Sequence, residues 1–150
     1  MFPSRKSELT DEFKASLTEF LPKYIKIITQ KKYRKSISEI RIEGHTDDVP
    51  IGVTDDSYID NIQLSQDRAR NVLAFLRSLP VYKRLNQSDE LMLKYWLTAN
   101  GLSYGRMLDN NKDLALFSEK EINKTNSRRV EFKILTRSED LIEQVIKQLK

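Results

Sequence analysis

Two hydrophobic periods alternate along this chain, and their alternation restricts the fold more than any other feature of the sequence. An apolar residue every three or four positions, as in an amphipathic helix, is found in residues 10–28, 64–79 and 138–149. Apolar and polar residues alternate, as in a half-buried strand, in residues 38–43 and 129–135, and residues 96–100 are a further candidate strand. Since strands and helices in such an order bury their apolar sides against one another, the pattern predicts an α/β sandwich with helices packed on a sheet.

Polar residues indicate where the helices begin and end. Thr10 is the predicted N-cap of the first helix, because its hydroxyl can accept a hydrogen bond from a free main-chain N–H group. Ser65 is predicted to cap the second helix, which we expect to end just before Pro80. Residues 81–89 are polar, and we interpret them as a loop.

Length and charge limit what the chain can be. Its 150 residues match a single domain, residues 1–150, and a chain of this length buries roughly two-thirds of its unfolded surface. The net charge of +4 is small beside a charged fraction of 32%, so it permits a nucleic acid partner without requiring one. The absence of cysteine excludes disulfides and thiolate chemistry. No apolar run approaches the roughly 20 residues of a membrane span, and the abrupt start at MFPSRKSEL is expected of a domain excised from a longer protein with an anchor upstream.

Arg68 stands out on the second helix because it falls in the apolar half of the helical wheel, four residues from both Leu64 and Val72. An arginine is almost never fully buried without a partner, so Arg68 is expected to need an anion. The nearest acidic residues are Asp47 and Asp48. In the structural interpretation, Arg68 forms a salt bridge with an aspartate or extends its charged end to solvent. In the functional interpretation, Arg68 and an aspartate form a charge pair in a ligand pocket that is open to solvent. In the pocket interpretation, Arg68→Leu would preserve or raise stability while abolishing binding.

The loop EGHTDDVPIG, residues 43–52, contains the only histidine of the chain. We expect no zinc site there, because His45 has no second histidine or cysteine to complete a set of ligands. Its acidic residues lack the spacing of a calcium loop, and no nucleophile elbow accompanies a triad of His45, Asp47 and Ser65. The basic stretch KKYRK, residues 31–35, is interpreted as a solvated turn rather than a nucleic-acid site, since no stacking platform accompanies it. The sequence thus predicts no metal, no cofactor and no catalytic activity.

Four stretches occur in an order that resembles a known family. They are IRIEGHTDDVPI, NIQLSQDRARNVLAFL, GLSYGRML and NSRRVEFKI, preceded by FPSRKSEL at the start of the chain. Together they resemble the OmpA-like (OmpA/MotB-type) peptidoglycan-binding domain over nearly the whole chain. The resemblance implies a mixed four-stranded sheet of βαβαβ-type order with helices packed on one face, followed here by an extra C-terminal helix.

The resemblance also implies a pocket for the diaminopimelate of the peptidoglycan stem. The aspartate of the family motif GHTD falls on Asp47, which would accept the ammonium, and the arginine of L-S-x-x-R-A falls on Arg68, which would hold the carboxylate. A guanidinium presents a planar fork of donors that matches a carboxylate, and a carboxylate accepts the donors of an ammonium. Asn61 and Thr46 would be secondary contacts or loop braces. Arg128, the first arginine of R-R-V-E, would lie at the pocket rim or be a solvated arginine at a strand end.

The sequence departs from the family pattern in three places. Pro50 replaces a glycine that many members carry, which gives a D-V-P-I loop closer to that of flagellar stator B subunits. Residues 81–95 look like an insertion before the following strand. Ser127 replaces the asparagine that commonly precedes the paired arginines.

The function implied by the resemblance is non-catalytic binding of peptidoglycan through diaminopimelate, which anchors an envelope protein to the cell wall. We therefore expect a periplasmic location, an upstream membrane anchor and a homodimer. The parent protein would be a stator-like subunit, a lipoprotein or an outer-membrane protein. The alternative is an OmpA-like structural scaffold, such as a stator-like complex subunit, whose pocket no longer binds a wall ligand.

Overall fold

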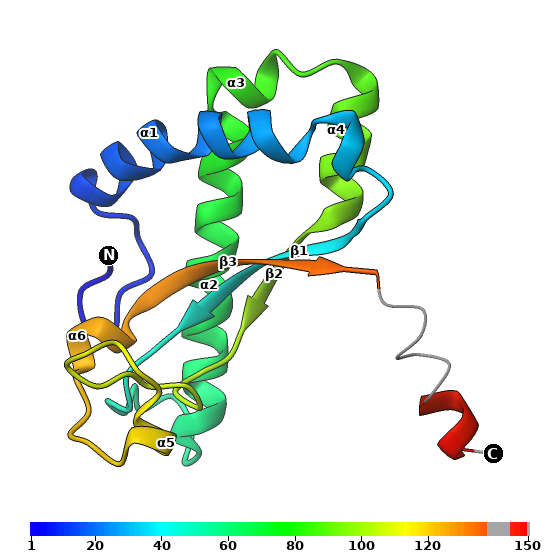
Figure 1. Cartoon of the computed structure of the whole chain (residues 1–150). Coiled ribbons are helices and arrows are strands. Elements are labelled where there is room, and N and C mark those ends of the chain that lie inside the picture. The colour runs from blue at the N-terminus through cyan, green and yellow to red at the C-terminus, as the bar shows by residue number, and fades with distance from the viewer. Residues whose placement is uncertain (138–144, 150) are drawn as a thin grey trace.

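A mixed three-stranded sheet lies at the centre of the computed structural model, which describes residues 1–137 and 145–149 (Figure 1). The strands are β1 (Ile37–His45), β2 (Leu97–Gly101) and β3 (Arg129–Thr136), in the order β2-β1-β3. The central strand β1 pairs in parallel with β2 and antiparallel with β3. Both strands predicted from alternating polarity and the further candidate at residues 96–100 are therefore present, each within two residues of its expected bounds.

The predicted count of four strands is wrong for the described residues, because the sheet has three. Residues 1–10 form turns and irregular structure, and several of their carbonyl groups accept hydrogen bonds from side chains instead of from a neighbouring strand. Residues 102–128 form turns, isolated bridges and two single-turn helices, α5 (Ala115–Ser118) and α6 (Lys124–Ser127). Neither region offers the run of free main-chain groups that a fourth strand would need.

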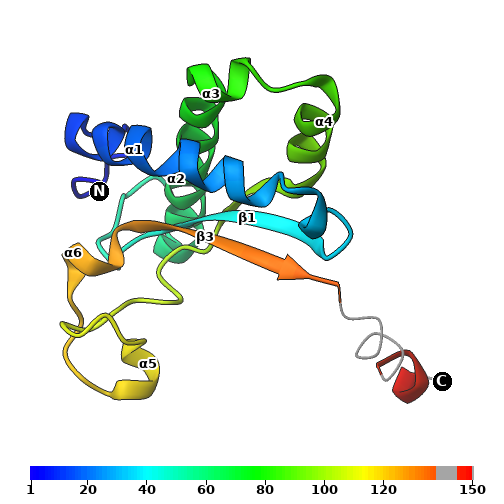
Figure 2. The same cartoon turned by 45° about the horizontal axis from the view of Figure 1, so that its top comes forward.

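The two long helices, α1 (Asp11–Ile28) and α2 (Ser57–Ser78), pack on the same face of the sheet. Ile40 and Ile42 of β1 point to this face and are fully buried. The rings of Phe20 and Tyr24 in α1 contact Phe132 of β3. α1 crosses α2 on this side of the sheet (Figures 1 and 2). The helix predicted for residues 10–28 is confirmed, and the Thr10 side chain accepts the capping hydrogen bond from Phe13 N.

The second helix begins earlier than its apolar pattern predicts. α2 starts at Ser57, and its N-cap is Asp56, whose side chain accepts from Tyr58 N and Ile59 N. The prediction of Ser65 as the cap is wrong, since Ser65 lies inside the helix, where its Oγ donates to Ile62 O. The first two turns carry buried polar residues under the preceding loop, so the apolar period that marks the rest of the helix is absent there.

The stretch predicted as a loop at residues 81–89 is also helical. It contains α3 (Pro80–Lys83) and the start of α4 (Gln87–Trp96), which Asn86 caps through Asp89 N. α4 buries only Leu93 and Trp96, too few apolar residues to produce a visible helical period. The Trp96 ring N–H donates to Ile37 O, which fixes α4 to the start of β1.

The C-terminal helix predicted from the sequence is described only in part. Of the helix predicted for residues 138–149, residues 138–144 lie outside the described residues, and residues 145–149 are helical.

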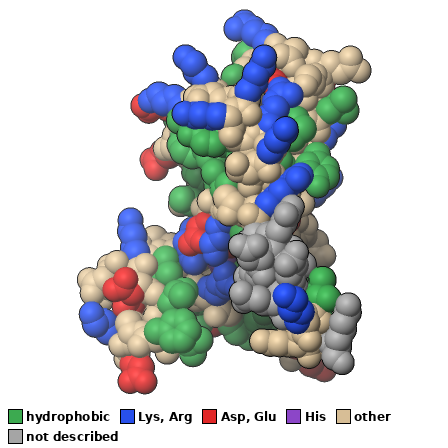
Figure 3. Space-filling view, turned by 45° about the vertical axis from the view of Figure 1, so that its right-hand side comes forward, with side chains coloured by type: hydrophobic (Ala, Val, Ile, Leu, Met, Phe, Trp, Pro, Cys, Tyr) green, Lys and Arg blue, Asp and Glu red, His purple; other side chains and the backbone are tan. Residues whose placement is uncertain are grey.

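The basic stretch KKYRK contains a 3-10 turn, η1 (Lys31–Tyr33), and Arg34 in this stretch pairs with Asp89 of α4. Lys and Arg side chains are spread over the upper part of the surface in Figure 3. Among the described residues, no helix is both long and apolar enough to cross a membrane.

Candidate ligand-binding site

The predicted site residues meet where the carboxyl end of β1 lies against the first half of α2. Two glycines allow this contact: a Cβ atom on Gly44 would lie 1.9 Å from Ser65 O, and one on Gly101 would lie 2.6 Å from Gln66 N. The ends of β1 and β2 therefore rest directly on the α2 main chain. This close approach brings the loop that follows β1, with Asp47, next to the α2 turn that carries Arg68.

Asp47 is already paired within the chain. Its side chain is 5% exposed, and Oδ2 accepts a hydrogen bond from Arg128 Nη1 at 2.9 Å. The other oxygen, Oδ1, accepts from the main-chain N–H of Val49 at 3.1 Å and so closes a turn. Both carboxylate oxygens of Asp47 are thus engaged, one of them by a cation.

Arg68 is completely buried, with 0% exposure. Its Nε donates to Lys6 O at 2.8 Å, its Nη1 to His45 O at 3.0 Å and its Nη2 to Pro3 O at 3.1 Å. Burial lowers the pKa of Arg68 to about 10, and the charge of Asp47 offsets part of this effect, so the side chain remains charged at neutral pH. Within the described part of the chain, the guanidinium is thus held by main-chain carbonyl groups and not by the carboxylate that the helical wheel led us to expect.

Arg128 links Asp47 to the start of the chain. Besides its ion pair with Asp47, it donates from Nε to Phe2 O at 3.0 Å and from Nη2 to Thr125 Oγ1 at 3.2 Å. Its side chain is 17% exposed, which makes it the most accessible of the paired charges at this site. Arg128 lies between α6 and the start of β3, as the strand-end interpretation expected, but it is paired with Asp47 and mostly buried instead of solvated.

Asn61 and Thr46 brace the loop around Asp47. Asn61 Nδ2 donates to Val49 O at 3.3 Å and to Ser57 O at 2.9 Å, which fixes the loop to the first turn of α2. The main-chain N–H of Thr46 donates to Ser103 O at 3.0 Å. Both residues are buried, and the contacts that they make in this structure are those of the loop-brace interpretation.

Sequence reasoning missed three residues that shape the site: Phe2, Asp60 and Asn71. Phe2 is buried with its ring 4.9 Å from the Arg68 guanidinium; it opens the stretch FPSRKSEL of the family resemblance, but no role was assigned to it. Asp60 accepts hydrogen bonds from the main chain of Thr54 and Val53 and from the Thr54 hydroxyl, which lowers its pKa. Asn71 lies on the polar half of the wheel, where sequence gives no reason to single it out.

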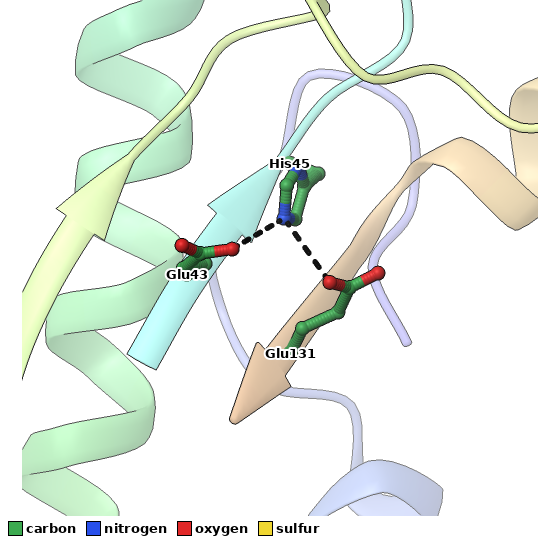
Figure 4. A group of neighbouring side chains, drawn as sticks. All are labelled: Glu43, His45 and Glu131. Carbon is green, nitrogen blue, oxygen red and sulfur yellow. Dashed lines mark ion pairs between the residues drawn. The ribbon is translucent and has the colours of Figure 1, made fainter. Parts of the chain in front are cut away.

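A second polar cluster, with Glu43 and His45 buried and Glu131 partly exposed, lies on the opposite face of the sheet (Figure 4). His45 Nε2 lies 3.6 Å from Glu43 Oε1 on its own strand and 3.8 Å from Glu131 Oε2 on β3. Burial, with Arg129 as the next cause, lowers the pKa of His45 to about 4, so the ring is neutral at pH 7. The three ligand atoms lie within 4.8 Å of one another, a set that the sequence pattern did not reveal.

Cations of the chain itself already neutralise this cluster. Lys133 Nζ lies 3.0 Å from Glu43 Oε1 and 3.7 Å from Glu131 Oε2. Arg129 Nε lies 2.6 Å from the other oxygen of Glu131. A metal ion bound here would have to displace the lysine and would be repelled by the arginine, so the charges favour a structural ion network.

The fold is that of MotB periplasmic domains and OmpA-like domains. The C-terminal domain of Helicobacter pylori MotB matches with a TM-score of 0.58 at 18% identity, over 99% of this chain and 93% of that domain. The peptidoglycan-associated lipoprotein of Burkholderia pseudomallei matches with a TM-score of 0.50 at 18% identity, over 91% of this chain and 86% of the lipoprotein. The predicted resemblance to OmpA-like domains of the MotB type is thereby confirmed.

Among curated proteins, the chain is similar to Zorya protein ZorB of Escherichia coli. The two are 31% identical over 150 residues, which cover 99% of this chain and 58% of ZorB. The chain therefore spans somewhat more than half the length of this relative. No protein-family model matches the chain.

Proposed function

We propose that the chain is a non-catalytic domain that binds peptidoglycan through the diaminopimelate of the peptide stem and so anchors an envelope protein to the cell wall. The observation that carries the proposal is the meeting of Asp47, Arg68 and Arg128 at one buried site in a fold shared with a peptidoglycan-associated lipoprotein. The proposed setting is the periplasm, since the matched MotB structures are periplasmic domains.

The contacts inside the chain resemble those that the ligand would make. Arg128 places a cation on Asp47 where the ammonium of diaminopimelate would bind. The carbonyl groups of Pro3 and Lys6 place oxygen atoms on Arg68 where its carboxylate would bind. On binding, the ammonium of the ligand would replace the Arg128 guanidinium at Asp47. The carboxylate of the ligand would replace the Pro3 and Lys6 carbonyl groups at Arg68, so that a charged acceptor replaces two neutral ones.

A structural scaffold without wall binding is the second candidate. The burial and internal pairing of Asp47 and Arg68 favour it, because neither charge is free in this structure. For either candidate, the relation to ZorB, of which the chain spans 58%, leads us to propose a longer parent protein. The upstream membrane anchor and the homodimer expected from the family resemblance stay predictions.

Retention on purified peptidoglycan separates the two candidates. Wild type should be retained, and free diaminopimelate should compete for binding. Asp47→Asn removes the charge but keeps the size of the side chain, so we expect a loss of about 1.5 to 3 kcal/mol, roughly ten- to a hundredfold in affinity. Melting curves of the purified variants must accompany the assay, because the substitution also weakens the pair with Arg128.

Asp48→Asn is the matched control. The Asp48 side chain is 42% exposed and lies 3.5 Å from Lys124 Nζ, so its charge is largely screened and its loss should change retention little. Titration with lysine, which lacks the second carboxylate of diaminopimelate, should give weaker binding than diaminopimelate. Equal binding of the two amino acids, or equal damage from both substitutions, would contradict the pocket assignment. Release of soluble wall fragments would instead indicate an enzyme.

A further inference from the structure

The first residues of the chain lie across the candidate site. We call residues 2–7 the N-terminal strap. Phe2 anchors the strap: it is 4% exposed, and its ring packs edge-on against Phe13 with 5.5 Å between ring centroids. Pro3 to Lys6 are exposed, and Lys6 N donates to Pro3 O, so the strap forms a turn of its own. One apolar side chain therefore fixes an otherwise exposed segment.

Side chains of the site hold the strap by its main-chain carbonyl groups. These hydrogen bonds are Arg128 Nε to Phe2 O at 3.0 Å, Arg68 Nη2 to Pro3 O at 3.1 Å, Arg68 Nε to Lys6 O at 2.8 Å and Asn71 Nδ2 to Ser7 O at 2.9 Å. All four donor atoms belong to side chains, so none of these bonds is part of the main-chain hydrogen bonding of a helix or sheet. The strap can therefore leave without breaking the secondary structure of the domain.

We propose that the N-terminal strap is a reversible lid that closes the Asp47–Arg68 site and competes with the wall ligand for it; this inference rests on the proposed function. Nε and Nη2 of Arg68 form one edge of the guanidinium, the edge that binds both oxygens of a carboxylate side by side. Two strap carbonyls occupy that edge, while Nη1 is bound to the buried His45 carbonyl. Opening the strap would free the carboxylate-binding edge and leave the arginine fixed in place.

The chemistry of the exchange favours a charged ligand. A carboxylate makes stronger hydrogen bonds to a guanidinium than a neutral carbonyl does, so a ligand carboxylate can displace Pro3 and Lys6. Arg5, at the tip of the strap, has φ 60°, a left-handed conformation that non-glycine residues adopt at a cost. When the strap opens, Arg5 can leave this conformation and the Pro3 and Lys6 carbonyl groups separate from Arg68. Opening also exposes Phe2 to water. The burial of Phe2 therefore keeps the lid closed together with the four hydrogen bonds to the strap carbonyls.

Phe2→Ala is the variant that tests the lid. If a site is open for only a fraction of the time, its apparent affinity is the affinity of the open site multiplied by that fraction. Loss of the Phe2 ring should raise the open fraction, and we expect retention on purified peptidoglycan to strengthen by about tenfold or more. Phe20→Ala is the matched control: it removes the same atoms from a residue that is 45% exposed and contacts Tyr24 and Phe132, so it should leave binding unchanged.

Trypsin provides a second readout in the wild-type chain, independent of any effect of Phe2→Ala on folding. Arg5 and Lys6 are exposed cleavage positions in the strap, and cleavage requires the segment to unfold locally. A soluble muropeptide that contains diaminopimelate should accelerate cleavage after these residues, measured by mass spectrometry, because it stabilises the open state. Slower or unchanged cleavage at saturating muropeptide would overturn the lid.

The outcomes also separate the lid from the proposed function. If wild type and Phe2→Ala bind peptidoglycan equally, or Phe2→Ala binds more weakly, the strap is a fixed part of the site and only the lid is refuted. If neither binds, wall binding fails and the lid fails with it. Binding by Phe2→Ala that exceeds wild type, with Phe20→Ala unchanged, supports both.

Discussion

Replacing Arg68 by leucine tests what stabilises the buried guanidinium. In the pocket interpretation of the sequence, Arg68→Leu would preserve or raise stability, whereas the three hydrogen bonds of Arg68 in the structure lead us to expect a loss. Leucine removes the hydrogen bond from Arg68 Nη1 to the buried His45 carbonyl, which costs about 1.5–3 kcal/mol. It also releases the strap, and the resulting exposure of Phe2 costs up to about 1.5–3 kcal/mol. Removing a desolvated cation offsets part of this sum, so we expect a net loss of about 2–4 kcal/mol.

Urea unfolding and thermal melting measure this loss directly. For a chain of this size each kcal/mol shifts the melting temperature by about 2–4 °C, so Arg68→Leu should lower it by roughly 4–16 °C. Arg70→Leu is the control, since Arg70 is exposed on the same helix and should change stability by no more than about 0.5 kcal/mol. A melting temperature of Arg68→Leu equal to or above that of wild type would refute the reasoning, because burial of the cation would then cost more than its three hydrogen bonds contribute.

Four further substitutions test other features of the fold. The pKa of His45 is about 4 in the folded chain and 6.5 in a model peptide, so between pH 6.5 and pH 4 the unfolded chain binds a proton that the folded chain does not. As the pH falls through this range, the free energy of unfolding should therefore drop by up to roughly 3 kcal/mol. His45→Gln should make urea unfolding less dependent on pH in the same range. Ser65→Ala leaves the buried N–H of Ser103 without its acceptor and should cost about 1–3 kcal/mol. Asp56→Ala removes the cap and should cost about 1 kcal/mol and reduce helix content at the start of α2; an Asp56→Ala variant with the urea unfolding and helix content of wild type would contradict the assigned helix start. Gly44→Ala places Cβ 1.9 Å from Ser65 O and should cost about 3 kcal/mol or more, and a melting temperature like that of wild type would show that β1 and α2 are further apart.

The sequence determined the elements in which apolar and polar side chains lie on opposite sides. In β1 and β3 the polarity of each residue follows from the face on which it lies, so both strands were found with nearly correct bounds. The same applies to α1, where Thr10 marks the start. The family motifs selected Asp47 and Arg68, and the fold brings them to one site with Arg128.

Only the tertiary structure decided the start of α2 and the existence of α4. The first turns of α2 bury Asp60 and Asn61 under the loop after β1, where polar contacts with that loop replace apolar packing. α4 buries a single apolar stripe of two residues. In both regions the helical pattern is too weak to read, because burial there depends on segments that are distant in the sequence.

The partners of Arg68 were also decided by the tertiary structure alone. Its position in the apolar half of the helix predicted burial correctly, and the need for a partner followed from its charge. The partners proved to be carbonyl groups of His45, Pro3 and Lys6, the last two from the first residues of the chain. Every residue carries the same carbonyl group, so no side-chain pattern can indicate which of them a distant arginine will bind. That choice depends on how the chain path brings residues 2–7 across α2.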